Sequence, residues 1–564
     1  MKAKIQFIAL LLTAIVATSC DSFLEEENKS SITAENYFVT ADGYDALVSG
    51  AYATLRTVWE DEPWLFCLGV DIFTRGESEL IGSSYGDRDT YSSQLNEYGK
   101  LDSQNPYVQD LYDDLYYAIQ ACNTVIAWSE KVSDLTEDEI EVYCAEARFL
   151  RAYYYFLLVE QYGDIPLVTD EITTTITHFD RIEESEIYDF MISELEEIAD
   201  VLPSETDDFG RATSGAANNL LALVYLTRGY KTYGSSSDFA TAASLADQVI
   251  NSGVYKLLST FEEVFEEGNE VNDEIIFSVQ YDSSSLGSSI YNGNAQSAMF
   301  GFELWNKVTS GFEAYNTTYN WHKPQFTPTQ FLYSLYDTDI DSRYDVTFLS
   351  EYYATIDDGD VKEGDLRLYF PTYDKDFTEA DSLALIAENP NVIIITKSLW
   401  KQDIENIGGS GMFPMIWKFY NSVDPWPSNN TSYSGTKDIF LFRLAETYLI
   451  AAEAYLQAGN TSTAAERINS VRKRAALSGC ESDMTISASD VDIDFILDER
   501  ARELAGEYKR WPDLKRTGKL IERTLLYNNL AQADNAMDDH ILLRPIPQTI
   551  IDQDTGDFEQ NPGY

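Results

Sequence analysis

The sequence predicts a mainly helical fold, built from irregular tetratricopeptide-like helical hairpins and a loop-rich lobe that contains short β-strands. Two observations predict this fold. Apolar residues recur with the helical period toward both ends of the 564-residue chain. The middle, residues 258–437, instead contains seven of the 15 prolines and five of the nine tryptophans, among short runs such as EIIFSVQY and NVIIIT. We therefore expect a helical scaffold interrupted by one irregular region.

The chain begins with a segment typical of a secretion signal. Lys2 and Lys4 precede an apolar run, residues 5–17, which is shorter than the roughly 20 residues that a membrane-spanning helix needs. Cys20 follows the small residues at 17–19, an order similar to the bacterial lipobox, in which the cysteine is lipidated. We expect residues 1–19 to be a signal peptide and Cys20 to be the lipidated first residue of the mature protein. An ordinary signal peptide with an incidental cysteine is the alternative.

Residues 20–257 and 438–564 carry the helical periodicity and are predicted to form the scaffold. The clearest hairpin joins FRLAETYLIAAEAYLQAG to NTSTAAERINSVRKRAAL, and Gly459 is the expected stop of its first helix. Its large and small residues follow the tetratricopeptide spacing at Tyr448, Ala452, Tyr455, Ala464, Ile468 and Val471. Three further pairs of helical segments upstream are predicted to form similar hairpins, with longer loops between their two helices. Thr136 and Glu139 have the spacing of a capping box, which predicts the start of a helix.

The irregular region 258–437 is predicted to be functional. A stretch of this length without regular structure is usually a binding region or a disordered one, and its aromatic content argues against disorder. We therefore expect this aromatic-rich lobe to contribute to a ligand site.

The charge of the chain excludes some partners. It contains 39 lysines and arginines against 95 aspartates and glutamates, which gives a formal net charge of −56. Phosphate backbones and anionic lipid headgroups would be repelled by this charge. Nucleic acid is therefore excluded as a partner, and attachment to a membrane would require a covalent lipid.

The remaining cysteines do not predict a metal site. Cys67, Cys122, Cys144 and Cys480 include no C-x-x-C pair, so zinc is unsupported. Cys122 and Cys144 lie equally far from a predicted turn near Ser133, and on two antiparallel helices they would come to the same height. Cys122 and Cys144 either form a disulfide or remain two buried thiols that pack as small apolar residues.

No sequence pattern predicts catalysis. The three histidines, His178, His322 and His540, are not in an H-E-x-x-H spacing, and GGSGM lacks the G-x-S-x-G order of a nucleophile elbow. Paired carboxylates would suit a glycosidase, but a chain with 95 acidic residues contains such pairs by chance. We therefore do not expect an enzyme.

No cofactor is expected. Asp337, Asp339 and Asp341 alternate as in an EF-hand, but Ser342 replaces the turn glycine and Phe348 stands where the bidentate glutamate would be. The acidic composition still permits a structural calcium ion, at a site that the sequence does not place.

The segment LDERARELAGEYKRWPDLKR is dense in charge and is predicted to be scaffold, because charged helical faces are usually solvated or paired. Its charges have the spacing of intrahelical ion pairs, namely Asp498–Arg502, Arg500–Glu503 and Glu507–Arg510. Trp511 is expected to pack beneath them.

Several motifs occur together and in order. Toward the C-terminus they are FRLAETYLIAAEAYLQAG, ILDERARELAGEYKRWPDLKRTGKL, LLRPIPQTIID and QNPGY, and upstream they are CDSFLEEE and AEARFLRAYYYFLLVEQYGDIPL. Over nearly the whole chain, this set resembles the SusD/RagB family of Bacteroidetes outer-membrane lipoproteins. The resemblance implies a mostly helical fold, a place on the outer face of the outer membrane, and a SusC-like TonB-dependent transporter as partner. It also implies that the acidic residues after Cys20 are similar to a surface-export signal.

The favoured function is a lipid-anchored, cell-surface protein that binds a glycan, either an oligosaccharide or a polysaccharide, and delivers it to the transporter. A peptide- or protein-binding uptake protein similar to RagB is the alternative, because the family includes members linked to peptide uptake. A secreted hydrolase is the third hypothesis, and it would need a positioned acid and base that the sequence does not show.

Sugar rings stack on aromatic faces while their hydroxyls bind polar side chains, so exposed aromatics with polar neighbours are the candidates for a glycan site. The candidates are Trp64, Tyr85, Asp71, Arg75 and Glu77 after the first helix, and Tyr291, Trp305 and Trp321 in the lobe. The resemblance implies a ligand-facing aromatic shortly before KPQFTPTQFL, which favours Trp321 as the exposed platform, followed by Trp64. For each tryptophan the alternative is a core residue.

Overall fold

The computed structural model describes residues 33–60, 63–76, 88–282, 293–313, 318–319, 325–400, 411–423, 435–532 and 536–564. Cys20 and the predicted signal peptide lie outside these ranges. Glu77, Tyr85, Tyr291 and Trp321 also lie outside them, so their assignment to a ligand site stays a prediction.

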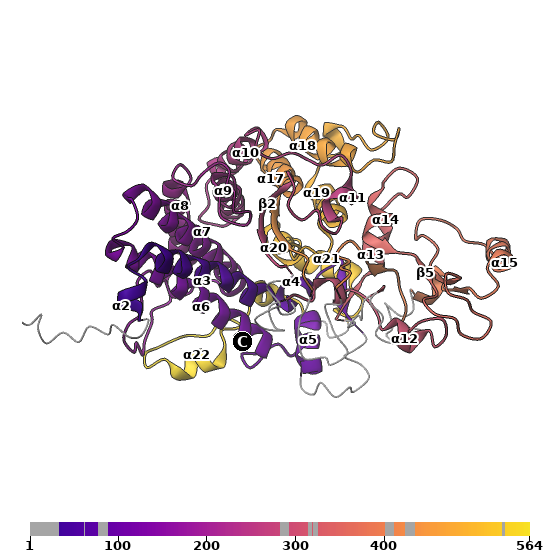
Figure 1. The fold of residues 1–564 in the computed structure, drawn as a ribbon, viewed down its shortest axis with the longest axis horizontal. Coiled ribbons are helices and arrows are strands. Elements are labelled where there is room, and N and C mark those ends of the chain that lie inside the picture. The colour runs from indigo at the N-terminus through magenta and orange to yellow at the C-terminus, as the bar shows by residue number, and fades with distance from the viewer. Residues whose placement is uncertain are drawn as a thin grey trace, which may run out of the picture.

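Helices form the body of the molecule, which confirms the predicted mainly helical class (Figure 1). The first set is α2 (Ala34–Tyr37), α3 (Ala41–Glu60), α6 (Pro106–Trp128), α7 (Glu137–Tyr162), α8 (Glu184–Ile198), α9 (Ser214–Gly229) and α10 (Ser236–Ile250). The second set is α17 (Leu444–Gln457), α18 (Thr461–Arg474) and α19 (Ile493–Leu504). Because α10 packs against α17, one helical array joins both parts of the sequence. Within the described ranges, no helix combines the length and the apolar character that crossing a bilayer requires.

The capping box predicted at Thr136 begins α7. The Thr136 hydroxyl accepts a hydrogen bond from the Glu139 amide at 3.3 Å, and the Glu139 carboxylate accepts one from the Thr136 amide at 2.8 Å. The helix ends at Gly163, whose φ of 73° favours glycine. Most of α7 from Ala145 onward is buried, because α3, α6, α8 and α9 pack around it.

Cys122 on α6 and Cys144 on α7 are free thiols, so the alternative of a disulfide between them is wrong. The Cys144 sulfur lies 3.6 Å from the hydroxyl of Tyr44. Burial raises the pKa of Cys122 to about 12, which keeps this thiol protonated. Cys122 therefore packs as a small apolar residue.

Short strands occur in the middle of the chain, as predicted, and two of the strand pairs join it to the helical body. β2 (Ile275–Val279) pairs antiparallel with β9 (Ile439–Arg443), which leads directly into α17. β1 (Phe73–Arg75) pairs antiparallel with β3 (Phe326–Pro328) and so joins the chain after α3 to the lobe. The other strands are β4 (Phe348–Leu349), β5 (Glu351–Tyr353), β6 (Leu366–Tyr369), β7 (Ile393–Ile394) and β8 (Met415–Ile416), with β4 paired to β8 and a sheet of order β5-β6-β7.

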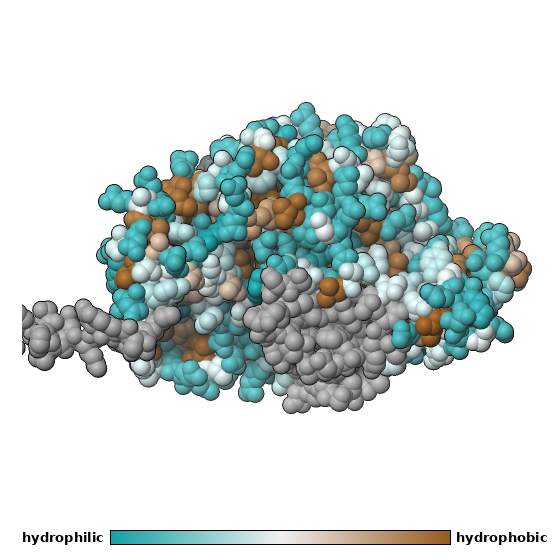
Figure 2. Space-filling view, viewed as in Figure 1, coloured by the Kyte–Doolittle hydropathy of each residue, from teal (hydrophilic) through white to brown (hydrophobic). Residues whose placement is uncertain are grey.

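Shorter helices complete the lobe and the C-terminal region. They are α4 (Trp64–Cys67), α5 (Arg88–Glu97), α11 (Phe261–Phe265), α12 (Leu304–Lys307), α13 (Gln330–Ser334), α14 (Arg343–Thr347), α15 (Glu379–Glu388), α20 (Arg510–Arg516), α21 (Leu520–Tyr527) and α22 (Gln548–Gln553). On the face shown in Figure 2, hydrophilic residues predominate and apolar residues are scattered rather than gathered in one patch. The hydrophobic core lies instead between the helices and continues into the lobe.

The charged residues around α19 form a buried ionic network. Glu499 and Glu503 are fully buried, and their carboxylates accept hydrogen bonds from Arg343 at 2.8 and 3.0 Å. Glu503 also binds Arg443, on the last position of β9, at 2.7 Å. A buried charge without a partner is strongly destabilising, so these buried charges are stable only because they are paired with one another.

The intrahelical pairs Asp498–Arg502, Arg500–Glu503 and Glu507–Arg510 predicted for this segment are wrong. The observed ion pairs are Arg500–Asp513, Arg502–Glu499, Arg510–Asp71, Arg523–Asp498 and Arg443–Glu507. Only Arg502–Glu499 lies within α19, because this helix is covered by other elements that supply oppositely charged side chains. Trp511 is fully buried, as expected.

Candidate functional site

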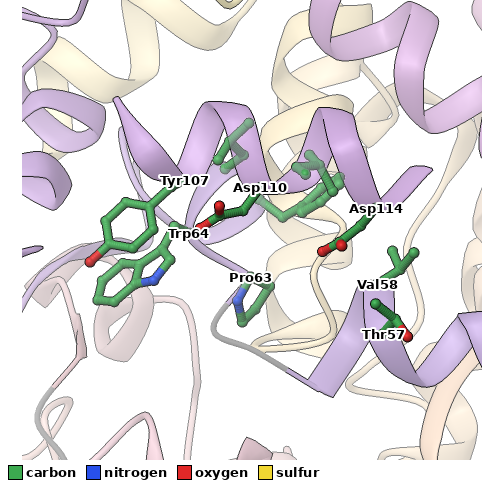
Figure 3. A pocket seen from close by; sticks show the side chains of 10 residues that line it. Thr57, Val58, Pro63, Trp64, Tyr107, Asp110 and Asp114 are labelled. Carbon is green, nitrogen blue, oxygen red and sulfur yellow. The ribbon is translucent and has the colours of Figure 1, made fainter. Parts of the chain in front are cut away.

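A notch beside the end of α3 combines aromatic walls with polar side chains (Figure 3). It is lined by Thr57, Val58, Pro63, Trp64, Leu65, Phe66, Tyr107, Asp110, Leu111 and Asp114. These residues come from the last turns of α3, the chain into α4, and the first turns of α6. The notch therefore lies in the segment after the first long helix, where the sequence predicted part of the ligand site.

The chain geometry after α3 fixes the position of Trp64. The Pro63 carbonyl accepts hydrogen bonds from the amides of Phe66 and Cys67 at 3.0 and 3.1 Å, which closes the single turn of α4. On the other side of the notch, the Asn105 side chain caps α6 by accepting a hydrogen bond from the Tyr107 amide at 3.1 Å. Two short, well-defined helix starts thus place Trp64 opposite Tyr107.

The Trp64 ring is a wall of the notch and not an exposed platform, which corrects the sequence prediction. Only 5% of Trp64 is exposed. Its ring stacks on Tyr107 with centroids 4.7 Å apart and planes 24° apart, and it meets Phe326 edge-on at 5.0 Å. These two rings cover the tryptophan, because α6 and β3 both pack against α4 at this point.

The indole nitrogen of Trp64 is the unusual polar group of the notch. Trp64 Nε1 is buried and has no hydrogen-bond acceptor. A buried donor that lacks an acceptor is destabilising by about 1–3 kcal/mol. A ligand oxygen or a water in the notch would remove this cost, so the group marks a place where a polar partner is favoured.

Two carboxylates face the same space. Asp110 is exposed and Asp114 is half-buried, and they lie one turn apart on the same side of α6, directed toward the space beside Pro63 (Figure 3). The notch is open to solvent and has a cavity volume of about 50 Å³. A water needs roughly 10–15 Å³ by this measure, so the recess has room for a few waters or small polar groups.

Asp71, predicted as a ligand residue, is instead a structural residue. Its side chain is fully buried, and its two oxygens accept hydrogen bonds from Arg510 at 2.7 and 2.6 Å and from Arg523 at 2.9 Å. Burial alone would raise the pKa of Asp71, but the two arginines hold this pKa below its ordinary value. A fully buried carboxylate in this position cannot reach a ligand.

Arg75 and Trp305 lie elsewhere than the notch. Arg75 ends β1 and donates a hydrogen bond from Nε to Glu97 at 2.6 Å, and both side chains are mostly buried. Trp305 lies on α12 and is partly buried against the core. Of the predicted site residues that the structure describes, Trp64 lines the notch, whereas Asp71, Arg75 and Trp305 do not.

A second aromatic group was missed by the sequence prediction. Trp417 and Tyr420 stack with centroids 4.3 Å apart and planes 24° apart, and both rings are partly exposed. Tyr319 lies 6.1 Å from Trp417. The three-residue spacing of two aromatics in WKFY could have indicated this pair, since both lie in the lobe that was predicted to bind a ligand.

A row of aromatic rings joins the notch to this part of the lobe. Trp64 contacts Phe326, Phe326 lies 5.4 Å from Phe300, and Phe300 lies 6.1 Å from Phe419, between Trp417 and Tyr420 in the chain. Such contacts stabilise the relative positions of the rings. The notch and the Trp417–Tyr420 pair are therefore held on one continuous core.

A larger cavity, about 490 Å³, lies on the opposite face of α6. It is lined by Tyr112, Asp113, Tyr116, Ile119, Gln120, Pro166, Val168, Ile172, Ile176, Thr177, Phe179, Ile550, Gln553, Asp554 and Phe558. Several of its polar groups already bind one another: Tyr116 donates to the Pro166 carbonyl, and Asp554 accepts from the Phe179 amide. Its lining is mostly apolar, like that of the notch.

Comparisons with known proteins agree over the length of the chain. The SusD family model matches residues 273–564, which is more than half of the chain, and a model described as "Starch-binding associating with outer membrane" matches residues 22–226. A SusD-like protein of Formosa agariphila is 27% identical, with 100% of each chain covered. The starch-binding protein SusD of Bacteroides thetaiotaomicron is 28% identical, covering 77% of this chain and 75% of that protein.

Solved structures share the fold. A laminarin-binding SusD-like protein superposes with a TM-score of 0.69 at 22% identity, covering 93% of this chain and 100% of that one. Surface glycan-binding protein A from Bacteroides thetaiotaomicron, in complex with laminarihexaose, superposes with a TM-score of 0.68 at 21% identity, covering 93% and 99%.

Proposed function

Because the chain belongs to the SusD/RagB family, a family associated with the outer membrane, we propose that it is a cell-surface lipoprotein that binds a glycan and delivers it to a SusC-like TonB-dependent transporter. The named ligands of relatives, starch and laminarin, support a glycan as the ligand class. The proposal includes no catalysis. No cofactor is part of it.

The observation that carries the proposal is the buried indole N–H of Trp64 in a notch that also contains carboxylates. A sugar hydroxyl both accepts and donates hydrogen bonds, so one hydroxyl would accept from the indole and donate to Asp110 or Asp114. The volume of about 50 Å³ suits a single hydroxymethyl or hydroxyl group that projects from a ring held outside the notch.

Titration calorimetry with starch and laminarin oligosaccharides, and in parallel with mixed peptides, tests the proposal. We expect a glycan to bind without products appearing, and Trp64→Phe to weaken binding by up to about tenfold, because phenylalanine keeps a ring but removes the N–H. Trp128→Phe is the matched control: Trp128 is also buried, but its N–H donates to Glu171 at 3.2 Å, away from the notch.

Peptide binding without glycan binding would favour the uptake of peptides or proteins instead, as in the RagB alternative. Release of shortened sugars would favour a hydrolase. Equal glycan affinity of Trp64→Phe and the parent would remove the notch from the binding site.

The anchor and the transporter are tested in the native membrane. We expect Cys20→Ala to release the protein from the outer-membrane fraction and to abolish labelling by a fatty-acid probe, since no other lipid attachment is proposed. A pulldown of the parent protein in mild detergent is expected to recover a large TonB-dependent transporter. Continued labelling of Cys20→Ala, or recovery of the protein alone in several detergents, contradicts these two parts of the proposal.

A further inference from the structure

We propose that the cavity of about 490 Å³ on the opposite face of α6 is a second binding site, which takes a small uncharged molecule with an apolar ring system and one hydrogen-bond donor. This ligand differs in chemistry from a glycan, so the inference goes beyond the proposed function and does not depend on it. It is carried by the size of the cavity, by its apolar lining and by one buried acceptor.

The cavity is built from three segments that are distant in the sequence. One wall is α6, the second is the connection between α7 and α8 at residues 166–179, and the third is α22 with the chain after it, up to Phe558. Figure 1 shows α22 below α6. Sites for small organic ligands usually have volumes of about 300–1,000 Å³. A cavity of about 490 Å³ therefore has the size of such a site.

The walls of the cavity are held together without a ligand. Tyr116 on α6 donates a hydrogen bond to the Pro166 carbonyl at 2.8 Å. On the other side, the Asp554 carboxylate accepts a hydrogen bond from the Phe179 amide at 3.0 Å. Because these bonds fix the walls in advance, a ligand does not have to order them, and more of its contact energy contributes to affinity.

The lining favours an apolar ligand. Ile172 and Ile176 line the cavity but are 39% and 47% exposed, and the rings of Tyr112, Phe179 and Phe558 also line it. A ligand that covers these side chains removes apolar surface from water, which is favourable. Flat ring systems also pack well on aromatic side chains. The cavity therefore suits a ligand with an aromatic body.

A sugar fits this lining less well. It carries hydroxyls on most of its edges, and each hydroxyl that leaves water needs a new hydrogen-bonding partner. Two polar groups of the cavity are already engaged, because Tyr116 donates to Pro166 and Asp554 accepts from Phe179. A bound sugar would therefore lose hydrogen bonds to water that the cavity replaces only in part.

The lining also disfavours charged ligands. Among the described residues that line the cavity, none is an arginine or a lysine, so an anion would find no cationic partner. A cation would find Asp113, but this side chain is exposed, and solvent weakens its attraction. Any ion that enters apolar surroundings also loses hydration. The ligand is therefore uncharged.

The Gln120 side chain adds a specific polar requirement. It belongs to α6 and lines the cavity, and its Oε1 atom is buried and accepts from no donor in the described part of the chain. Buried polar atoms usually have a hydrogen-bonding partner, so this oxygen marks a place where a donor is favoured. A hydroxyl or N–H group on the ring system would supply that donor.

Titration of the mature protein with 2-naphthol and with 2-methoxynaphthalene tests the site, since the two compounds share a ring system and only the first has a donor. We expect fluorescence titration to show saturable binding of 2-naphthol at one site. 2-Methoxynaphthalene should bind about three- to tenfold more weakly, because it cannot donate to Gln120 Oε1. The ratio of the two affinities measures the contribution of the donor.

Gln120→Leu should bring this ratio to about one, because leucine keeps the approximate size of the side chain but has no acceptor. Gln104→Leu is the matched control. Gln104 is exposed, precedes α6 and does not line the cavity, so this variant should keep the ratio of the parent.

Ile172→Ser with Ile176→Ser should weaken the binding of 2-naphthol by about tenfold, because less apolar surface is covered by the ligand. The matched control is Val271→Ser with Leu526→Ser, two residues that are 64% and 60% exposed and do not line the cavity. Circular dichroism checks that both double variants are folded. If the isoleucine variant folds poorly, Ile176→Ser alone replaces it.

Absence of saturable 2-naphthol binding by the parent overturns the inference, as does an isoleucine variant that binds 2-naphthol as tightly as the parent. Equal affinity of the parent for the two naphthalenes overturns the assigned donor. Glycan titrations separate this site from the proposed function, since we expect the isoleucine variant to bind glycans like the parent. Failure of the parent to bind any glycan rejects the proposed function but leaves the second site in place.

Discussion

Asp438 is a buried carboxylate without an ion-pair partner in the described part of the chain. It accepts hydrogen bonds from the Tyr281 amide at 2.8 Å and from the Gln280 side chain at 2.6 Å. Burial raises the pKa of Asp438 to about 7, the Tyr281 hydrogen bond lowers it, and the nearby Glu270 charge raises it further. Arg56 favours the ionised form, but its guanidinium donates to the Gln280 carbonyl.

Asp438→Asn should therefore change stability in a pH-dependent way. Between about pH 4 and pH 7 the unfolded aspartate is ionised while the folded one keeps its proton, so the parent loses stability as the pH rises. The free energy of unfolding of the variant, minus that of the parent, should rise with pH by up to about 1.4 kcal/mol per unit in this window and then level off.

Chemical denaturation at several pH values measures this difference. Asp357→Asn serves as the control. Asp357 is exposed and its pKa is lowered, so the difference in free energy of unfolding between this variant and the parent should not rise from pH 4 to pH 7. A difference that stays constant from pH 4 to pH 8 would show that Asp438 ionises normally.

Single residues also show what the sequence could and could not predict about the site. The segment after α3 was predicted to contribute, and Trp64 does line the notch. Its burial could not be predicted, since Tyr107 and Phe326, which cover it, are far away in the sequence. The same limit applies to Asp71, whose partners Arg510 and Arg523 follow it by 439 and 452 residues.

At the scale of elements, α19 is held by ionic contacts from several directions. Glu499 binds Arg343 at 2.8 Å and Arg472 at 2.8 Å, from α14 and α18 respectively. Burial raises the pKa of Glu499, but Arg343 and the neighbouring arginines lower it more, so the carboxylate stays charged. One carboxylate thus fixes α19 against two other helices.

Glu499→Gln should lower the free energy of unfolding by roughly 3–5 kcal/mol, because it leaves buried arginine charge uncompensated. Lys362→Ala breaks the exposed pair with Asp357, in which the two side chains are 60% and 65% exposed, and should leave the stability nearly unchanged. Thermal unfolding followed by calorimetry, or unfolding by denaturant, measures the stability loss of each variant relative to the parent. Similar small losses would mean that the network around α19 contributes little.

Elements differ in how well the sequence predicts them. The capping box of Thr136 and Glu139 was predicted correctly because both partners lie within one turn of a helix. The ion pairs of α19 were predicted incorrectly because sequence spacing reveals only local partners, whereas a buried helix takes its partners from other elements. Local hydrogen-bonding patterns are therefore better predicted than tertiary charge contacts.

At the scale of the whole molecule, the C-terminal residues are tied to the chain that connects α7 and α8. The Asp554 carboxylate accepts a hydrogen bond from the Phe179 amide at 3.0 Å, and the Thr177 carbonyl accepts one from the Thr555 amide at 2.8 Å. Asn561 donates to the carbonyl of Tyr162 at 2.9 Å. These contacts close one side of the 490 Å³ cavity.

Asp554→Ala should loosen this connection. Hydrogen exchange of the Phe179 amide is expected to speed up by at least about tenfold, because its acceptor is lost. Asp557→Ala is the control, since Asp557 is an exposed acid in the same segment with no described contact to the connection. Unchanged exchange at Phe179 in Asp554→Ala would show that the segment is held by its other contacts alone.

The overall class of the fold was predicted from periodicity, since helices and short strands leave a repeating local signal. The packing of α10 against α17 was not predicted, because nearly 200 residues of irregular chain lie between them and no repeat spans such a gap. The division into a scaffold and a lobe at residues 258 and 437 stays a prediction.

Asp71 has a consequence for how the protein is made. A ribosome completes the chain from the N-terminus, so the carboxylate is synthesised long before Arg510 and Arg523, which follow it by 439 and 452 residues. Until then, burying Asp71 would leave a charge without a partner, which disfavours early closure of the core around α4. We therefore expect a chain that ends before Arg510 to leave the core around α4 open, so that limited proteolysis cuts it there more readily than the full-length protein.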